Sequence, residues 1–423
     1  MISLYVHIPF CDYKCEYCNF YVIQKNHPNF LPNLISDYII SLKNELNKWK
    51  DIYPDEQIRT IYLWWGTPSS IWKEYIKQII DHISLLWSLE FLEELSIELN
   101  PDPFDSNIDL IKDLSNTYKN FPRIRFSFGI QTLDDDVLEL AGRQYVFNNI
   151  KWFLRNLQPI KKPNMVYNFD MIAFGTLQNW NKSRLEFWED FVRSMVADSF
   201  SVYTLELFPW SKWHQLSHGQ DLTNHSNTSS TRLLQKMIHP DDEKIMEEFE
   251  YIKNTLYKNG YNRYETSNFA RPGFGSIHNQ VYWNLDPYIW VWCSASGLVY
   301  EKDKDKLINI FQANENKYQD NIKAVRYTNT TSISDYIKGN YVDPKKTTLL
   351  SSKDLQIEWF FLKMRSWGVK NIERYKNILI HDYQHKIEIL IKDGYIIKNG
   401  NFVSFTDNGY DLSNTILSDI IEF

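Results

Sequence analysis

The sequence lacks the features that mark secreted and membrane-spanning proteins. It has only four cysteines in 423 residues, three of them close together, so they do not make a disulfide framework. No apolar run approaches the ~18 residues that a membrane-spanning helix needs. The apolar stretch 2–10 is short and has no basic segment before it, which indicates a strand rather than a signal peptide. We therefore expect a soluble, cytoplasmic protein.

Positive charge and glycine are also in short supply. The formal net charge is −7, which argues against the basic footprint of a nucleic-acid-binding protein. Glycine accounts for only 14 residues, fewer than the 15 tryptophans, whereas glycine usually makes up ~7% of a protein. The hydrophobic share of 43% and the charged share of 23% are those of an ordinary globular protein. The chain is long enough for one large domain and one small domain.

Three cysteines form the most informative motif: Cys11, Cys15 and Cys18, with the spacing C-x3-C-x2-C. Thiolates are the usual ligands of iron–sulfur clusters, and four of them normally complete a [4Fe–4S] cluster. Three thiolates leave one iron open to a substrate or cofactor. A zinc site that adds His7 or another histidine is one alternative. One face of a helix is another, but Pro9 and the tyrosines between the cysteines favour a loop that follows a strand.

Strand-like and helix-like segments alternate through the first half of the chain. This alternation predicts βαβ units around a parallel sheet, and six such units indicate a partial or full (β/α) barrel. In such barrels the chemistry lies at the carboxyl ends of the strands, where the polar motifs of this sequence fall. The predicted strands cover 2–8, 58–63, 95–99, 125–130, 166–173 and 200–207, and the predicted helices cover 33–49, 70–86, 105–116, 180–195 and 241–259.

The second half of the chain predicts a smaller domain. Its two helices and its hairpin resemble a winged helix, but the second helix lacks the dense basic face of a DNA-binding protein. A polar insertion at 216–232 is expected to form a loop. The predicted divisions are 1–300 for the barrel with its extension, 301–345 for a charged linker region and 346–423 for the C-terminal domain. Within the C-terminal domain, the predicted elements are helices 353–366 and 383–392 and a hairpin at 395–405.

Several short motifs follow one another at the predicted strand ends. They are Leu4 to Cys11, Tyr17 to Phe20, Gly66-Thr67-Pro68, Glu98 to Pro101, Ser127 to Gln131, Gly142-Arg143, Phe169-Asp170 and Arg263 to Phe269. In this order they resemble the HemN/HemW family of radical S-adenosylmethionine (SAM) proteins. The resemblance covers nearly all of residues 2–300 and, more weakly, the C-terminal domain.

The resemblance implies a fold and a set of cofactors. The fold is α/β, a radical SAM partial (β/α) barrel with a small C-terminal winged-helix-like domain. The cofactors are one [4Fe–4S] cluster on Cys11, Cys15 and Cys18, and SAM, which chelates the open iron. Positions that contact SAM in the family correspond here to Tyr5, Tyr17, Phe20, Trp65, Gly66, Thr67, Glu98, Gln131, Arg143 and Asp170.

The chemistry of these residue types suits SAM. Glu98 and Asp170 can accept hydrogen bonds from an ammonium group or from ribose hydroxyls, and Arg143 can pair with a carboxylate through its planar fork. A glycine-rich strand end at Gly66 lets the backbone approach the ligand closely. A helix cap or a solvated carboxylate is the alternative for either acid taken alone.

Two features favour the haem-chaperone branch of the family over its coproporphyrinogen III dehydrogenases. The dehydrogenases carry a further cysteine two residues after the third ligand, where this chain has Phe20. They also have a long extension before the motif, whereas only ten residues precede Cys11 in this sequence. Residues 278–283, His-Asn-Gln-Val-Tyr-Trp, also match the H-N-x-x-Y-W haem-binding signature of the chaperones. This match makes His278 the candidate axial haem ligand. A buried histidine that holds a loop is the alternative.

The implied function is the binding of haem and its delivery to haem-acceptor proteins. The expected ligand is haem or a porphyrin, with no nucleic acid, and with membrane contact only through an acceptor. Oxygen-independent coproporphyrinogen III oxidation and radical SAM methyl transfer are the rival activities on this scaffold. The fourth cysteine, Cys293, is expected to be a small buried residue.

Tryptophan stands where the family has glycine. The family expects Gly-Gly-Gly-Thr-Pro, where this chain has Trp64-Trp65-Gly66-Thr67-Pro68. Trp290 and Trp292 also replace glycines, and Trp210 lies in a turn that favours one. Either these indoles obstruct SAM binding, or UGA codons that encode glycine in the source cell have been translated as tryptophan. Glycine and tryptophan together make up about 7% of the chain, the usual share of glycine alone, although Trp283 in the haem-binding signature is expected to be genuine.

Overall fold

The computed structural model describes residues 1–27, 30–64, 66, 70–101, 104–218, 228–303, 305 and 322–422. Two of the predicted SAM contacts, Trp65 and Thr67, lie outside the described residues. The same holds for the middle of the predicted polar loop, 219–227, and for much of the predicted linker.

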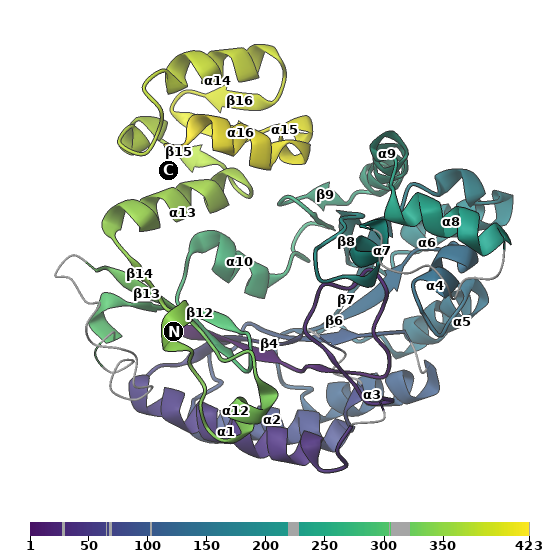
Figure 1. Cartoon of the computed structure of the whole chain (residues 1–423), viewed down its shortest axis with the longest axis vertical. Helices are drawn as coiled ribbons and strands as arrows, with labels where there is room; N and C mark the ends of the chain where they lie inside the picture. The colour runs from purple at the N-terminus through teal and green to yellow at the C-terminus, as the bar shows by residue number, and fades with distance from the viewer. Residues whose placement is uncertain are drawn as a thin grey trace.

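A large curved sheet forms the first domain (Figure 1). It has 12 strands in the spatial order β14-β13-β12-β11-β1-β4-β5-β6-β7-β8-β10-β9, and neighbouring strands from β11 to β8 are parallel. The parallel strands are β1 (Ile2–His7), β4 (Ile58–Trp64), β5 (Glu94–Leu99), β6 (Ile124–Gln131), β7 (Met165–Ala173), β8 (Ser199–Thr204) and β11 (Tyr288–Val291). The outer strands are β9 (Asn262–Arg263), β10 (Asn268–Ala270), β12 (Ser296–Tyr300), β13 (Ala324–Thr328) and β14 (Thr348–Leu350). Because the edge strands β9 and β14 do not pair with each other within the described chain, the barrel is open, and the predicted partial barrel is confirmed.

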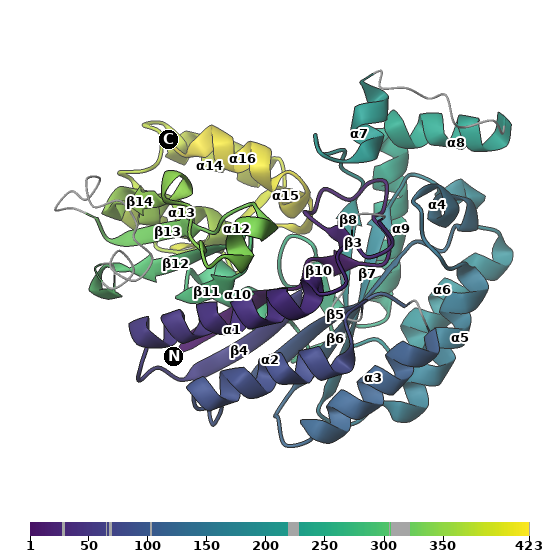
Figure 2. The same cartoon turned by 60° about the horizontal axis from the view of Figure 1, so that its bottom comes forward.

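Amphipathic helices cover the convex face of this sheet (Figures 1 and 2). In α1, Ile39, Leu42 and Leu46 face the sheet and are buried, as their spacing predicts. The helices of this layer are α1 (Leu34–Ile52), α2 (Lys73–Leu86), α3 (Phe104–Thr117), α4 (Asp135–Leu140), α5 (Phe147–Leu157), α6 (Lys182–Arg193) and α9 (Asp242–Lys258). The helix-and-strand alternation therefore builds the βαβ units that the sequence predicted.

Three segments differ from the sequence-based expectation. The predicted strand 200–207 ends at Thr204. The expected loop 216–232 is partly helical, because α7 (Lys212–Ser217) and α8 (Thr228–Ile238) flank its middle. The predicted linker contains β13 and α12 (Ile333–Ile337), and β13 joins the large sheet because alternate apolar side chains such as Val325 and Tyr327 are buried.

The C-terminal domain has a hydrophobic core of its own, which includes Phe360, Ile387, Val403 and Leu417. Its sheet has the order β15-β17-β16, and the predicted hairpin is the β16–β17 pair. The elements are α13 (Ser352–Met364), β15 (Val369–Lys370), α14 (Tyr383–Lys392), β16 (Ile396–Asn399), β17 (Phe402–Phe405), α15 (Asp407–Asp411) and α16 (Ser413–Ile420). Helices with a small hairpin agree with the winged-helix-like prediction.

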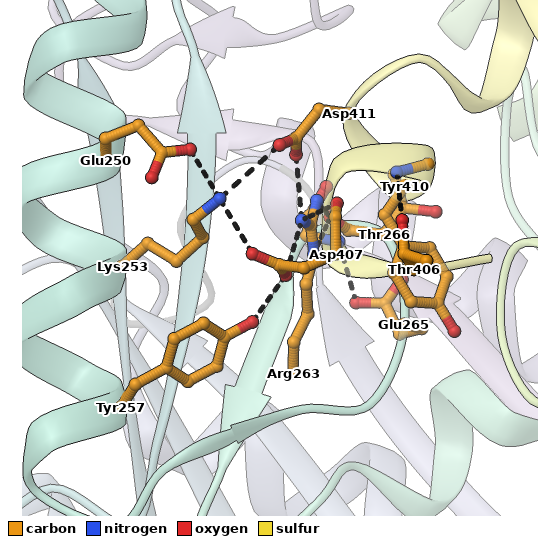
Figure 3. Close-up of polar contacts among 12 residues, drawn as sticks. Glu250, Lys253, Tyr257, Arg263, Glu265, Thr266, Thr406, Asp407, Tyr410 and Asp411 are labelled. Carbon is orange, nitrogen blue, oxygen red and sulfur yellow. Dashed lines mark hydrogen bonds and ion pairs between the residues drawn. The ribbon is translucent and has the colours of Figure 1, made fainter. Parts of the chain in front are cut away.

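An ionic cluster ties α15 to the barrel (Figure 3). Lys253 on α9 lies 2.8 Å from a carboxylate oxygen of Asp407 and 3.4 Å from one of Asp411. Arg263 on β9 lies 3.2 Å from Asp407 and 2.8 Å from Asp411. The side chains of Lys253 and Arg263 are only 3% and 4% exposed, so Arg263 depends on these two carboxylates, whereas Lys253 also pairs with Glu250 on its own helix. We call Lys253, Arg263, Asp407 and Asp411 the interdomain ion cluster.

The opposite side of the C-terminal domain is held mainly by apolar packing. Helix α13 packs beside α10 (Ile277–Asn284), and both views show the two helices together (Figures 1 and 2). Leu355, Trp359 and Leu362 of α13 contact a buried apolar cluster that includes Val281 of α10. The C-terminal domain is thus fixed against the barrel along two separate lines.

Candidate functional site

A cavity of about 720 Å³ lies at the carboxyl ends of the central strands. The cysteine motif and strands β4 to β8 supply most of its walls, and α9, the segment 263–267, Asn279 and the C-terminal domain supply the remainder. This is the position at which α/β barrels carry their chemistry. The predicted site residues that line the cavity are Cys11, Cys15, Cys18, Tyr17, Phe20, Gly66, Glu98, Gln131, Arg143 and Asp170.

The three cysteines lie on a loop that two short parallel strands close. β2 (Phe10–Cys11) pairs with β3 (Ile23–Gln24), and the loop between them carries Cys15 and Cys18. The backbone N–H of Glu16 donates to the carbonyl of Ala141 at 3.1 Å, and its carbonyl accepts from Trp213 at 3.1 Å. The loop is therefore held by the barrel on both sides.

Gly66 makes the approach to this loop possible. A Cβ atom at this position would lie 2.5 Å from the carbonyl oxygen of Ile8 and 2.7 Å from that of Phe10. No side chain fits against these backbone atoms, so glycine is required here. The glycine predicted for contact with ligand thus has a second role, in seating the strand that leads to Cys11.

The donor set fits an iron–sulfur cluster. Each thiolate of a [4Fe–4S] cluster binds a different iron, so its ligands need not converge on one point. Within the part of the chain that the structure describes, no three His, Cys, Asp or Glu side chains converge as a single metal ion would require. Burial and the neighbouring Cys15 raise the pKa of Cys18 to about 11, so iron binding would displace a proton from this thiol.

Glu98 and Asp170 form a half-buried acidic pair inside the barrel. Both point inward from adjacent parts of the sheet, and Ser127 on the strand between them donates to Asp170 at 3.1 Å. The hydroxyl of Tyr62 donates to Glu98. Burial, and then the negative charge of Asp170, raise the pKa of Glu98 to about 8. A cationic ligand group in the cavity would therefore offset the repulsion between the two carboxylates and favour their charged forms.

Arg143 and Gln131 occupy fixed positions near the carboxyl ends of β5 and β6. The guanidinium of Arg143 donates to Asn100 at 2.8 Å and to the hydroxyl of Tyr17 at 2.7 Å. Gln131 has φ of +69° at an irregularity in the pairing of β6 with β7, a conformation that non-glycine residues rarely adopt. Because Gly129 has no Cβ, it leaves room for the Gln131 side chain.

Tyr5 does not line the cavity. It is fully buried on β1, and its ring contacts those of Tyr62 and Trp64, which do line it. On its other side Trp290 packs at a ring-centroid distance of 4.4 Å. Two of the tryptophans at predicted glycine positions thus enclose Tyr5, and a smaller residue at 64 would open the cavity toward it.

His278 is buried on α10 with both ring nitrogens occupied. Thr60 Oγ1 lies 2.7 Å from Nδ1, and the hydroxyl of Tyr282 lies 2.6 Å from Nε2. Burial and the charge of Arg125 lower the pKa of His278 to about 3, so its imidazole is neutral. An iron could bind this ring only after one of the two hydroxyl groups moves. The adjacent residue, Asn279, lines the cavity directly.

Sequence reasoning missed several polar residues that complete the site. Arg125 is fully buried on β6, lines the cavity and faces Glu94 and Glu98. A signal for it exists, because Arg125, Ser127 and Gly129 alternate with Phe126 and Phe128 along one strand. The phenylalanines face the helices, as the contact between Phe128 and Phe153 of α5 indicates, so the polar set points inward.

Replacing Glu98 by glutamine is expected to flatten the pH dependence of stability. The folded protein holds a proton on Glu98 up to about pH 8, whereas the unfolded chain releases it near pH 4.5. The free energy of unfolding should therefore fall as the pH rises through this window and level off above it. Urea unfolding of the cluster-free protein at pH 5.5, 7 and 8.5 should show a difference between wild type and E98Q on the order of a few kcal/mol. The exposed Glu90→Gln control should follow wild type, and an E98Q profile parallel to wild type would contradict the assignment.

Comparison with known proteins first gives the class. The family model of the radical SAM superfamily matches residues 5–182, which contain the cysteine loop and most of strands β1 to β7. The solved structure described as "Coproporphyrinogen III oxidase (HemN) from Escherichia coli is a Radical SAM enzyme" superimposes with a TM-score of 0.70 at 17% identity, covering 99% of this chain and 89% of that chain. The fold is therefore the radical SAM fold, and this class uses a [4Fe–4S] cluster and SAM.

Curated relatives then give the family. Heme chaperone HemW of Bacillus subtilis (strain 168) is 30% identical over 304 residues, 71% of this chain and 71% of that protein. Heme chaperone HemW of Lactococcus lactis subsp. lactis (strain IL1403) is 28% identical over 420 residues, 98% of this chain and 96% of that protein. The chain belongs to the HemW family of radical SAM proteins. No helix among the described residues has the length and apolar character to cross a bilayer.

Proposed function

We propose that this protein binds haem and delivers it to haem-acceptor proteins in the cytoplasm. The observation that supports this most directly is membership of the HemW family along nearly the whole chain. The H-N-x-x-Y-W segment on α10 is a second support, because this helix borders both the cavity and the C-terminal domain.

The residues of the cavity suit the two resident cofactors. Cys11, Cys15 and Cys18 would hold the cluster, which supplies an open iron for SAM. Glu98 and Asp170 would accept hydrogen bonds from SAM, and their acidic pair would stabilise its positive charge. The cavity wall formed by α9 contributes the apolar side chains Met246 and Phe249, which would contact the larger ligand.

Replacing His278 by alanine is expected to weaken haem binding at least about tenfold and to shift the Soret band. The reason is that an axial ligand is lost, and even indirect partners of metal ligands contribute 10–100-fold. The measurement is a haem titration after anaerobic reconstitution of the cluster.

Tyr282→Phe is the matched control. It removes the hydroxyl next to Nε2 of His278 and leaves the ring in place, so haem affinity should be kept or increased. If both variants bind haem with the wild-type spectrum and affinity, the haem site lies elsewhere. Formation of decarboxylated product from coproporphyrinogen III would instead favour the oxidase activity, and methyl transfer from labelled SAM would favour a methyltransferase.

A further inference from the structure

The C-terminal wall of the cavity contains an arginine without a counter-ion. Arg365 directly follows α13 and lines the cavity. Its guanidinium makes no hydrogen bond or ion pair with any described residue, and its Nε is buried without a partner. The backbone is nevertheless fixed, because Thr266 of the barrel donates to the Arg365 carbonyl at 3.2 Å.

Two aromatic rings hold this side chain. The guanidinium lies 5.8 Å from the ring centre of Trp283 and 5.2 Å from that of Phe361. Such contacts orient an arginine but leave its N–H donors free. Trp283 is the last residue of the H-N-x-x-Y-W segment, so this segment positions Arg365 as well as His278.

The nearby acids do not neutralise Arg365. Glu206 and Glu265 are close enough to influence its charge, yet neither forms an ion pair with it. The carboxylate of Glu265 accepts instead from the backbone N–H of Ser267 at 3.2 Å. Burial lowers the pKa of Arg365, as expected for a cation that has lost water without gaining a partner.

Two other arginines in the cavity have partners, and a third, Arg125, lies on the barrel wall with Glu94 and Glu98 as its nearby acids. Arg143 donates to Asn100 and Tyr17, and Arg263 is part of the interdomain ion cluster. Arg365 thus differs from them in presenting unused donors to the cavity, on the wall that belongs to the C-terminal domain.

We propose that Arg365 binds a carboxylate of the cavity's ligand, a propionate group if the ligand is haem. This assignment rests on the proposed function. A planar guanidinium matches a carboxylate with two parallel hydrogen bonds. Apolar side chains that line the same cavity, Met246, Phe249 and Leu412, suit the face of a macrocycle that carries such carboxylates. Arg365 is therefore a specificity residue for an anionic, flat tetrapyrrole.

The test compares haem with haem dimethyl ester, in which both propionates are blocked. Wild-type protein, reconstituted with its cluster, should bind haem about 10- to 100-fold more tightly than the ester, the usual contribution of charge-assisted hydrogen bonds. Arg365→Gln should lose most of this preference by weakening haem binding alone, and Arg365→Lys should keep part of it. The exposed Arg374→Gln changes net charge equally and should behave as wild type.

The outcomes separate this assignment from the proposed function. If R365Q binds haem as tightly as wild type and still discriminates against the ester, the carboxylate is bound elsewhere and the assignment fails alone. If neither haem nor iron-free protoporphyrin IX binds wild-type protein, the proposed function fails and the assignment with it. Thermal unfolding of each variant shows whether the C-terminal domain remains folded.

Discussion

Replacing any one of Cys11, Cys15 and Cys18 by alanine is expected to abolish the brown chromophore of the anaerobically reconstituted protein. All three thiols line one cavity on one loop, and a cluster left with two protein ligands has lost a third of its attachment. Absorption spectra with iron and sulfide analysis measure the loss. This is the largest effect we expect from a single substitution, because SAM binding depends on the open iron.

Cys293→Ala provides the control for this experiment. Cys293 is buried and does not line the cavity, so its replacement should leave iron content unchanged. Purification under strict anoxia of a protein with stoichiometric zinc and no iron would overturn the cluster assignment and restore the zinc alternative.

Peptides from the source cell are expected to contain glycine at position 292. Trp292 has φ of +119°, a region that side chains rarely adopt, and it is fully buried with its indole N–H unpartnered. Such backbone strain costs about 1–3 kcal/mol, and an unpaired buried donor costs about as much again. Glycine would remove both penalties. Mass spectrometry decides directly, because the two residues differ greatly in mass.

Positions 64, 65 and 290 should follow position 292 if UGA encodes glycine in the source cell. Protein with Trp64→Gly and Trp65→Gly should then bind SAM more tightly than protein that carries tryptophan at both positions. The reason is that the indole at 64 occupies the cavity wall beside Tyr62. Trp283 serves as the internal control and should remain tryptophan. Tryptophan at positions 64, 65, 290 and 292 in native peptides would contradict the recoding hypothesis. The protein would then be a chaperone with impaired SAM chemistry.

Much of the barrel could be predicted because its information is local. Alternating apolar segments gave five of the seven parallel strands to within one residue at each end, and motifs at the strand ends gave Glu98, Gln131, Arg143 and Asp170, whereas β8 ends three residues early and β11 was not predicted. Since carboxyl ends of parallel strands meet at one edge, these side chains had to lie close together, and they line the same cavity.

The remaining features depend on contacts between distant segments. Strand β13 is short and follows a charged stretch, and its pairing with β12 and β14 decides its structure more than its own composition does. Arg365 follows a helix in another domain, and no spacing in the sequence relates it to the cysteines. Tyr5 was expected to contact SAM, but whether the cavity reaches it depends on the residue at position 64.

The interdomain ion cluster also means that the two domains are not separable modules. Removing the C-terminal domain would take away one wall of the cavity and both carboxylates that pair with Arg263, and would leave Lys253 only its pair with Glu250 on the same helix. In the barrel alone, the cavity beside the cysteine loop would be open to solvent on the side that the C-terminal domain covers. Residues of both domains line the cavity, so neither domain encloses it alone.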